Sequence, residues 1–277
     1  MTSIGKQSKI SARKLIKENF ILCFVTALLF TLPTQIYSFL PLLYNEGISF
    51  VIQLVCAPLV LVGCKVYVDI SNGDSTIKPT TVFSGYGNSK VTNTAIVAAW
   101  KTLIITVIAS IVPLILIFSG LLSVVIITGI TNNGIAFCIW LVATVISFII
   151  CFVFASAECS CIYLGTLASY LNGEDTQNVK KYIQIFKREM KKVFIFSIGP
   201  SLFYLTLAIV DIFLFVGSHI ITHTIGFMYL VACFTFYAKY TLDENIQNGT
   251  IQADISNISE NIYEESQKYL GVDQDLL

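Results

Sequence analysis

The chain has 277 residues, of which 55% are hydrophobic and only 12% are charged. Soluble globular proteins carry about 25% charged residues, so this composition indicates a protein that resides in a lipid bilayer. The 17 basic and 17 acidic residues cancel in total, but the basic ones cluster beside apolar runs and lack interleaved aromatic side chains for base stacking. This pattern argues against a nucleic-acid partner.

Apolar segments long enough to cross a bilayer recur along the chain. Since a helical span needs about 20 apolar residues, the sequence predicts six spans, at about 20–40, 48–67, 95–118, 135–155, 193–217 and 224–240. Together they form a transmembrane domain over residues 1–242, followed by an acidic cytoplasmic tail, 243–277. The first apolar run is too long for a signal-peptide core and is expected to stay in the mature protein. The predicted fold class is therefore an all-α polytopic membrane protein.

Two apolar stretches, Ala95–Ile130 and Ile135–Leu171, are each longer than one span. Dividing the first would place the basic cluster Lys180–Lys192 on the side opposite to the basic amino terminus, against the tendency of Lys and Arg to stay in the cytoplasm. We therefore predict six single spans with both termini in the cytoplasm. With this arrangement, the outer loops 41–47, 131–134 and 218–223 contain no Lys or Arg.

The surplus residues of these stretches need a place outside the spans. Leu114–Ile130 is expected to extend or bend along the outer interface after Pro113 and Gly120, which both disturb helices. The second stretch is expected to continue the fourth helix into the cytoplasm as far as the stop signal Asn172-Gly173. The main intracellular loop, 68–94, is rich in turn residues, and we expect its Val82-Phe83 and Tyr86 side chains to dip into the headgroup layer.

The segment Thr176–Phe194 is basic and amphipathic. Its apolar residues recur at three- and four-residue steps, as on one face of a helix: Val179, Tyr182, Ile183, Phe186, Met190, Val193 and Phe194. The remaining arc holds six positive charges: Lys180, Lys181, Lys187, Arg188, Lys191 and Lys192. The pattern predicts an interfacial helix that favours anionic lipids or a protein partner. The alternative is a juxtamembrane elbow whose charges only fix the topology.

Ionisable residues inside spans are candidates for function because a charge is costly there. Lys101 lies in the third span near its cytoplasmic side, and Glu158 lies at the cytoplasmic end of the fourth, so the two are candidates for an ion pair or a transport path. Asp211 lies near the outer end of the fifth span and is a candidate proton or ligand site. The alternative for Asp211 is a structural acid with hydrogen-bonding neighbours, among them His219 or His223 across the outer loop.

No motif of the sequence predicts catalysis or a cofactor. The eight cysteines lie in or beside apolar runs, and Cys159 and Cys161 form a C-x-C without a second pair of ligands at zinc-binding spacing. His219 and His223 alone make an incomplete metal site. The Gly-x-Ser-x-Gly nucleophile motif is absent, and Asp211 has no acidic partner at its level in the membrane. We expect a protein that is not an enzyme and binds no cofactor or metal.

Several segments follow one another in an order found in a known family. The chain contains ARKLIKENF at residues 12–20, a soft intracellular loop, a proline-bearing third span, QIFKREMKKVFIFSI at residues 184–198 and Phe236-Tyr237. In these features it resembles the uncharacterised integral-membrane family called domain of unknown function 975, found largely in low-GC Gram-positive bacteria. It departs from the family in having Pro113-Leu114 for a proline-glycine step and Glu158 for an aspartate. The resemblance implies a multi-pass protein of the bacterial cytoplasmic membrane without an established activity.

Two functions fit these features. The first is a non-enzymatic membrane protein that acts through its cytoplasmic face as an accessory, assembly or immunity factor, engaging a protein partner or anionic lipid through Lys180–Lys192 and the acidic tail. The second is a permease or the membrane subunit of a transporter, in which Thr176–Phe194 is touched by a soluble ATPase and substrate passes near Asp211. We also expect a weak, salt-dependent contact between the tail and the basic helix.

Overall fold

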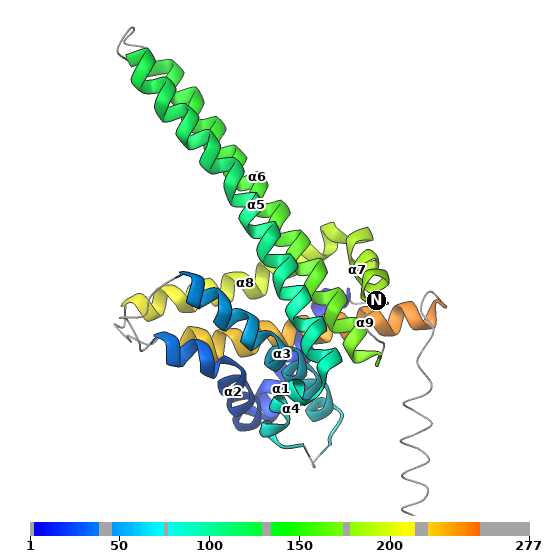
Figure 1. The fold of residues 1–277 in the computed structure, drawn as a ribbon. Coiled ribbons are helices and arrows are strands. Elements are labelled where there is room, and N and C mark those ends of the chain that lie inside the picture. Colours follow the sequence, from blue (N-terminus) through cyan, green and yellow to red (C-terminus); the bar gives the residue numbers. More distant parts are fainter. Residues whose placement is uncertain are drawn as a thin grey trace, which may run out of the picture.

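The structure is a computed structural model that describes residues 3–38, 46–74, 77–128, 134–173, 178–213 and 221–249. Within these residues the secondary structure is helical, with no strand (Figure 1). The predicted all-α class is therefore confirmed for the described part of the chain. Of the predicted acidic tail, 243–277, only residues 243–249 are described: they belong to the end of α9 and the turn after it, and Glu244 lines a recess together with Lys192. The rest of the tail, and with it the rest of its predicted contact with the basic helix, lies outside the described residues.

Two helices joined by a sharp bend begin the fold. α1 covers Ile4–Glu18 and α2 covers Phe20–Ser38, and the helix direction bends by 103° between α1 and the Phe20–Leu32 part of α2. α1 is amphipathic, and its buried side chains recur at three- and four-residue steps: Ser8, Ala12 and Leu15. This face packs against the last helix, α9 (Phe227–Gln247), while the basic residues Lys6, Arg13, Lys14 and Lys17 are exposed.

The third helix, α3 (Glu46–Ser71), is followed by a segment that folds back along it. This segment forms η2 (Pro79–Phe83) and the single turn α4 (Ser84–Gly87). A Cβ atom on Gly85 would lie 3.1 Å from the Pro58 carbonyl oxygen, so the returning backbone rests directly on α3. The cytoplasmic loop predicted from the sequence is therefore partly built into the bundle.

The side chains of this returning segment do not all go where the sequence indicates. Val82 is fully buried inside the protein instead of dipping into a headgroup layer. Its neighbours Phe83 and Tyr86 are both exposed, and the Tyr86 hydroxyl donates a hydrogen bond to the carbonyl oxygen of Val55. The prediction for Val82 is thus wrong, because the loop packs back onto α2 and α3 and supplies an apolar pocket for it.

A long helical hairpin projects from the rest of the molecule (Figure 1). It consists of α5 (Ser89–Thr128) and α6 (Gly134–Leu171), which lie side by side over their length. α5 continues through Pro113 as one helix and shows no bend in Figure 1, so the expected bend after Pro113 is not found. At about 1.5 Å per residue, its 40 residues extend about 60 Å, roughly twice the hydrocarbon thickness of a bilayer.

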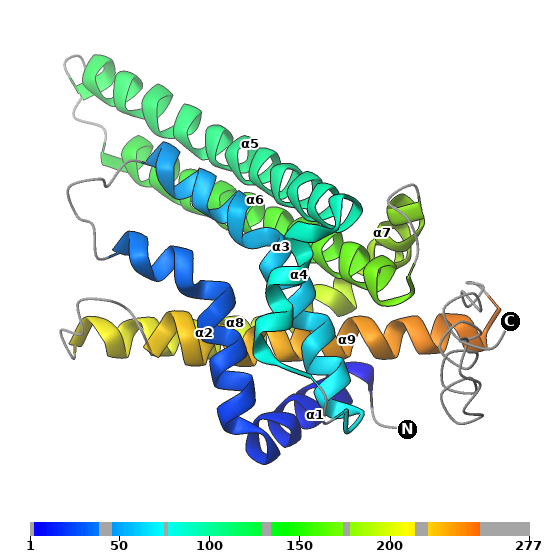
Figure 2. The ribbon, with the colours of Figure 1, turned by 60° about the horizontal axis from the view of Figure 1, so that its bottom comes forward.

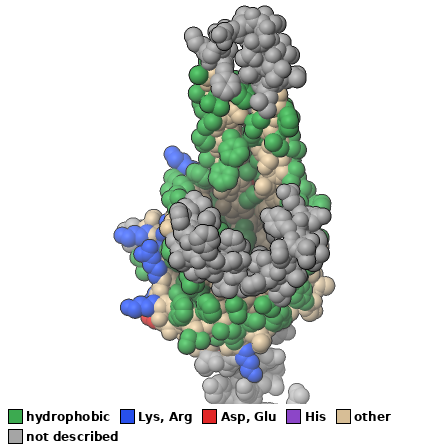
Figure 3. All heavy atoms as spheres, turned by 90° about the vertical axis from the view of Figure 1, so that its left-hand side faces the viewer, with side chains coloured by type: hydrophobic (Ala, Val, Ile, Leu, Met, Phe, Trp, Pro, Cys, Tyr) green, Lys and Arg blue, Asp and Glu red, His purple; other side chains and the backbone are tan. Residues whose placement is uncertain are grey.

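The hairpin exposes apolar side chains on all sides. In an apolar 18-residue window of each hairpin span, within Ser89–Ile115 and Cys138–Leu171, only 6% of the residues are buried, compared with 56% for the window in α3 and 67% for that in α9. Figure 3 shows hydrophobic side chains over the projecting hairpin and Lys and Arg side chains at the margins of the molecule. A surface of this kind is stable only when lipid or another apolar surface covers it.

The last third of the chain forms a compact base beside the hairpin (Figure 2). It comprises α7 (Val179–Arg188), α8 (Met190–Phe213), the π-helical turn η4 (Ile221–Gly226) and α9. Aromatic rings join α8 to α9, since Phe196 stacks on Tyr237 with centroids 4.2 Å apart. Together with α1 and α3 these helices contain the largest part of the buried core.

Four helices of the described part are long and apolar enough to cross a membrane, in Leu54–Ser71, Ser89–Ile115, Cys138–Leu171 and Thr224–Gln247. They correspond to the second, third, fourth and sixth predicted spans. The bent pair α1–α2 is a further candidate and contains the first predicted span. The fifth predicted span, 193–217, corresponds to α8, which does not count among these candidates. The number of six spans therefore stays a prediction, as does the side on which the termini lie.

Candidate functional site

The candidate site lies where α7 packs against the base of the hairpin. Lys101 of α5 and Glu158 of α6 are at the same level there, because the residues next to them touch: Cys159 Sγ lies 3.6 Å from the Thr102 carbonyl oxygen. From this level to the described ends of the hairpin helices, neither helix contains a charged residue. Lys101 and Glu158 therefore mark the boundary of the uncharged part of the hairpin.

Glu158 forms its ion pair with Lys187 of α7, whose Nζ atom lies 2.5 Å from Oε2. The Glu158 residue is 9% exposed, whereas the Lys187 side chain keeps 42% of its surface. The pair predicted between Lys101 and Glu158 is not among the ion pairs of the described residues. The two residues share a level, but α7 folds back onto α6 and brings a different lysine to the carboxylate.

The backbone of α7 approaches α6 very closely. A Cβ atom on Gly165 would lie 2.6 Å from both N and Cα of Ile183, so only glycine fits at this crossing. Tyr182 and Phe186, on the same face, are 0% and 2% exposed, and Asn172 Nδ2 donates a 2.8 Å hydrogen bond to the Tyr182 hydroxyl. The apolar face of α7 is therefore occupied by protein, and the predicted interfacial helix does not rest that face on lipid.

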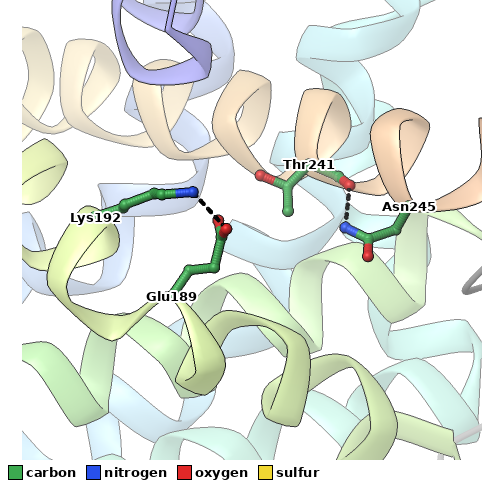
Figure 4. A network of polar contacts seen from close by, with 4 residues as sticks. All are labelled: Glu189, Lys192, Thr241 and Asn245. Carbon is green, nitrogen blue, oxygen red and sulfur yellow. Dashed lines mark hydrogen bonds and ion pairs between the residues drawn. The ribbon is translucent and has the colours of Figure 1, made fainter. Parts of the chain in front are cut away.

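The predicted basic helix consists of two helices. α7 ends at Arg188, and α8 begins at Met190, with Glu189 between them. Lys191 and Lys192 therefore belong to the first turn of α8, and Lys192 Nζ contacts Glu189 Oε1 at 2.5 Å (Figure 4). Glu189 raises the pKa of Lys192 by this hydrogen bond and by its charge. The six basic residues of the segment are exposed: Lys180, Lys181, Lys187, Arg188, Lys191 and Lys192.

A cavity of about 310 Å³ opens between α5, α6 and α7. Its polar lining combines two lysines with an amide and two hydroxyls: Lys101, Lys180, Asn93, Thr94 and Thr166. The rest of the lining is apolar and includes Val97, Ala98 and Ile162. Two of the residues predicted from the sequence as separate candidates, Lys101 and Lys180, are thus brought together by the fold.

A second cavity, of about 400 Å³, lies between the hairpin and the other helices. Its lining is mostly apolar and comes from α2, α3, α5, α6, α8 and α9, with hydroxyls from Thr102, Tyr163 and Tyr204 among them. Ala98 and Thr166 line this cavity as well as the first one. The two cavities therefore lie on either side of the α5–α6 contact.

Some predicted residues fall outside what the structure describes. Asp211 belongs to α8, but its side chain is outside the described part, and so are His219 and the side chain of His223. Among the described residues, no group of three or more His, Cys, Asp or Glu residues is placed to hold a metal ion. The eight cysteines are all free thiols, with Cys159 half-buried and Cys161 fully buried in α6.

Part of the cavity lining forms a helical stripe that is visible in the sequence. Thr94, Val97, Ala98 and Lys101 follow each other at i, i+3, i+4 and i+7 and form one helical stripe, which now lines the cavity. The spacing of Ser8, Ala12 and Leu15 is a similar signal in the sequence, because it predicts an amphipathic helix at α1. By contrast, the position of Lys180 at the same cavity depends on the fold, because Lys180 is 79 positions after Lys101 in the sequence.

The chain matches no protein-family model, no curated protein and no solved structure. The resemblance to domain of unknown function 975 accordingly stays a prediction. The fold itself defines the class, which is a helical protein with several helices long and apolar enough to span a membrane.

Proposed function

We propose that the protein is a non-enzymatic integral membrane protein of the bacterial cytoplasmic membrane that serves as an accessory, assembly or immunity factor. It acts by engaging a protein partner through the exposed basic side chains of α7 and the first turn of α8. Both termini lie in the cytoplasm in this proposal, on the same side as the basic surface.

The observation that carries the proposal is the way in which α7 is held. Its apolar face is buried against α6, and its backbone is fixed at Gly165. Lys181, Arg188 and Lys191 nevertheless remain exposed, and none of them forms an ion pair among the described residues. A rigid helix that presents unpaired positive charge suits recognition of an acidic partner surface, because little conformational entropy is lost on binding.

A permease, or the membrane subunit of an ATPase-coupled transporter, is the second candidate. The cavity of about 400 Å³ between the hairpin and the other helices supports it, because ligand sites of helical membrane proteins lie between helices. In this alternative, α7 is the element that a soluble ATPase contacts, and the cavity is part of the substrate path.

Affinity capture of the full chain from membranes in mild detergent tests the proposal. The variant carries Lys181→Glu, Arg188→Glu and Lys191→Glu, and leaves Lys180 intact. A matched control carries Lys6→Glu, Lys14→Glu and Lys17→Glu on the exposed face of α1, with the same change in charge. We expect a specific protein to be captured by the unmodified chain and the control, and to be lost from the α7–α8 variant.

Loss of the captured protein from both variants would show a charge effect without a defined surface and would contradict the proposal. Capture of a soluble ATPase that is lost from the α7–α8 variant and retained by the control would contradict the accessory role and favour the permease, because α7 is the element that the ATPase contacts in that alternative. Substrate uptake by vesicles containing the protein would then be the next measurement.

A further inference from the structure

We propose that the cavity between α5, α6 and α7 binds the phosphate of an anionic phospholipid headgroup. The inference rests on the membrane location in the proposed function, but not on the protein partner proposed there. Lys101 of α5 and Lys180 of α7 supply the positive charge, and Asn93 supplies an amide donor.

The charges of the cavity are not balanced within the described protein. Glu158, the acid at the level of Lys101, is paired with Lys187, and none of the described residues that line the cavity is Asp or Glu. Lys101 and Lys180 form no ion pair with the described residues. A larger recess of about 800 Å³ between α1, α8 and α9 also holds lysines, but Glu189 and Glu244 line it too. Of these two recesses, the cavity at α7 is therefore the one whose described lining contains lysines without an acidic residue.

The hydrogen-bond donors of the cavity can be assigned from its contacts. The Thr94 hydroxyl donates to the Lys90 carbonyl oxygen and the Thr166 hydroxyl to that of Ile162, both at 2.8 Å. Their protons are thus engaged, and donation to an anion is left to the two ammonium groups and to the Asn93 amide. These groups match a phosphodiester, which only accepts hydrogen bonds at its charged oxygens.

The amino-terminal end of α7 adds to this donor set. Val179 and Lys180, the first two residues of the helix, both line the cavity. The side chain of the N-cap residue Asn178 makes no capping hydrogen bond, so it does not satisfy the first amide groups of the helix. The positive end of the helix dipole therefore lies beside the same volume as the two lysines.

The apolar part of the lining selects a lipid over a free anion. Val97, Ala98 and Ile162 form one wall, and Val97 is 42% exposed. Trp100, which follows Val97 by three residues on α5, is 48% exposed. Apolar surface thus leads from the lysines to the lipid-facing side, where the glycerol and the acyl chains of a phospholipid would lie.

The depth of the cavity in the membrane agrees with a headgroup. After Lys101, α5 continues without a charged residue from Thr102 to Thr128. These 27 residues cover about 40 Å, enough to cross the hydrocarbon core at a tilt of roughly 40°. Lys101 therefore lies where the uncharged segment meets the interface, which is the layer of the phosphates.

Native mass spectrometry of the full chain in mild detergent tests the site. Phosphatidylglycerol and phosphatidylcholine with identical acyl chains are titrated, and the apparent Kd of each adduct is measured. We expect tighter binding of phosphatidylglycerol, weakened about fivefold by either Lys101→Ala or Lys180→Ala. Lys180→Arg should retain binding. The matched control is Lys181→Ala, because Lys181 neighbours Lys180 on the same helix and does not line the cavity.

Three results would overturn the inference. They are equal weakening by Lys181→Ala and Lys180→Ala, no preference for phosphatidylglycerol over phosphatidylcholine, and displacement of the lipid by an equal concentration of inorganic phosphate, which would make the site one for a free anion. The partner capture described above uses different residues. Its failure leaves the lipid result standing, and loss of lipid binding leaves the partner result standing.

Discussion

Lys187 of α7 and Glu158 of α6 form an ion pair in which the two partners are unequally buried. The Lys187 side chain keeps 42% of its surface exposed and the Glu158 side chain 11%. Removing Glu158 and removing Lys187 therefore have different consequences for the partner that is left. A lone lysine is solvated again at the surface, whereas a lone carboxylate stays largely buried without its counter-charge.

We expect Lys187→Ala to destabilise the protein more than Glu158→Gln. The first change should cost about 2 kcal/mol and the second about 1 kcal/mol or less. Thermal unfolding of the purified chain in detergent measures both. The double variant Lys187→Ala, Glu158→Gln should be more stable than Lys187→Ala alone, and a double variant that is the least stable of the three would contradict this assignment.

The close crossing of α6 and α7 predicts a strong effect at Gly165. Gly165→Ala places a methyl group against the Ile183 backbone, so α7 must move away, at a cost of about 1–3 kcal/mol. The same substitution at Gly87, which has open space around its Cβ position, is the control. Faster trypsin cleavage after Lys180, Lys181 and Arg188 in Gly165→Ala would report the release of α7. An unchanged cleavage rate would show that α7 does not depend on this contact.

Exposed positions of the hairpin are expected to tolerate one apolar side chain in place of another but not a charged one, whereas positions in the core should not tolerate even an apolar replacement. Phe152 of α6 is 65% exposed and faces lipid in the proposed membrane location, so Phe152→Leu should leave the yield of membrane-inserted protein unchanged. Phe152→Asp should reduce it, since an acid costs about 2.5–3.5 kcal/mol on insertion at the centre of a span and a smaller amount nearer the interface. Tyr237→Leu, in the aromatic stack with Phe196, should instead lower the unfolding temperature although it stays apolar. Equal tolerance of Phe152→Asp and Phe152→Leu would show that the hairpin faces water.

The positions of the two termini decide whether the number of spans is even or odd. Six spans place both termini in the cytoplasm, whereas five place them on opposite sides. Green fluorescent protein fused after residue 277 is expected to fluoresce, and alkaline phosphatase fused at the same point is expected to be inactive. The same two reporters fused before residue 1 should give the same result. Opposite results at the two ends would refute the six-span arrangement.

Local signals in the sequence predicted those features that depend on neighbours along the chain. The end of α6 at Leu171 follows from Asn172-Gly173, and Gly173 does adopt a positive φ of 73°. The apolar periodicity around Tyr182 identified the buried face of α7 in the same way. Composition and hydropathy were enough for the helical class, because each apolar run is itself the signal.

The features that the sequence did not predict depend on contacts between distant segments. The apolar spacing continues from Phe186 to Val193 across the break at Glu189, so periodicity alone merged α7 with α8. The sequence predicts Lys101 as a candidate counter-charge of Glu158, because both residues lie near the cytoplasmic ends of neighbouring predicted spans. Only the return of α7 onto α6 makes Lys187 the partner.

The first helix of the chain completes its packing with the last. The buried face of α1 lies on α9, and the hydroxyls of Ser11 and Tyr240 share a hydrogen bond of 2.7 Å. During synthesis, α1 emerges from the ribosome long before the segment that covers it. A nascent chain that stops before Phe227 therefore carries an amphipathic helix at its amino terminus whose apolar face lacks its main protein contact. This face is covered only once α9 has been made, so the packing of α1 is one of the last steps in the folding of the described part of the chain.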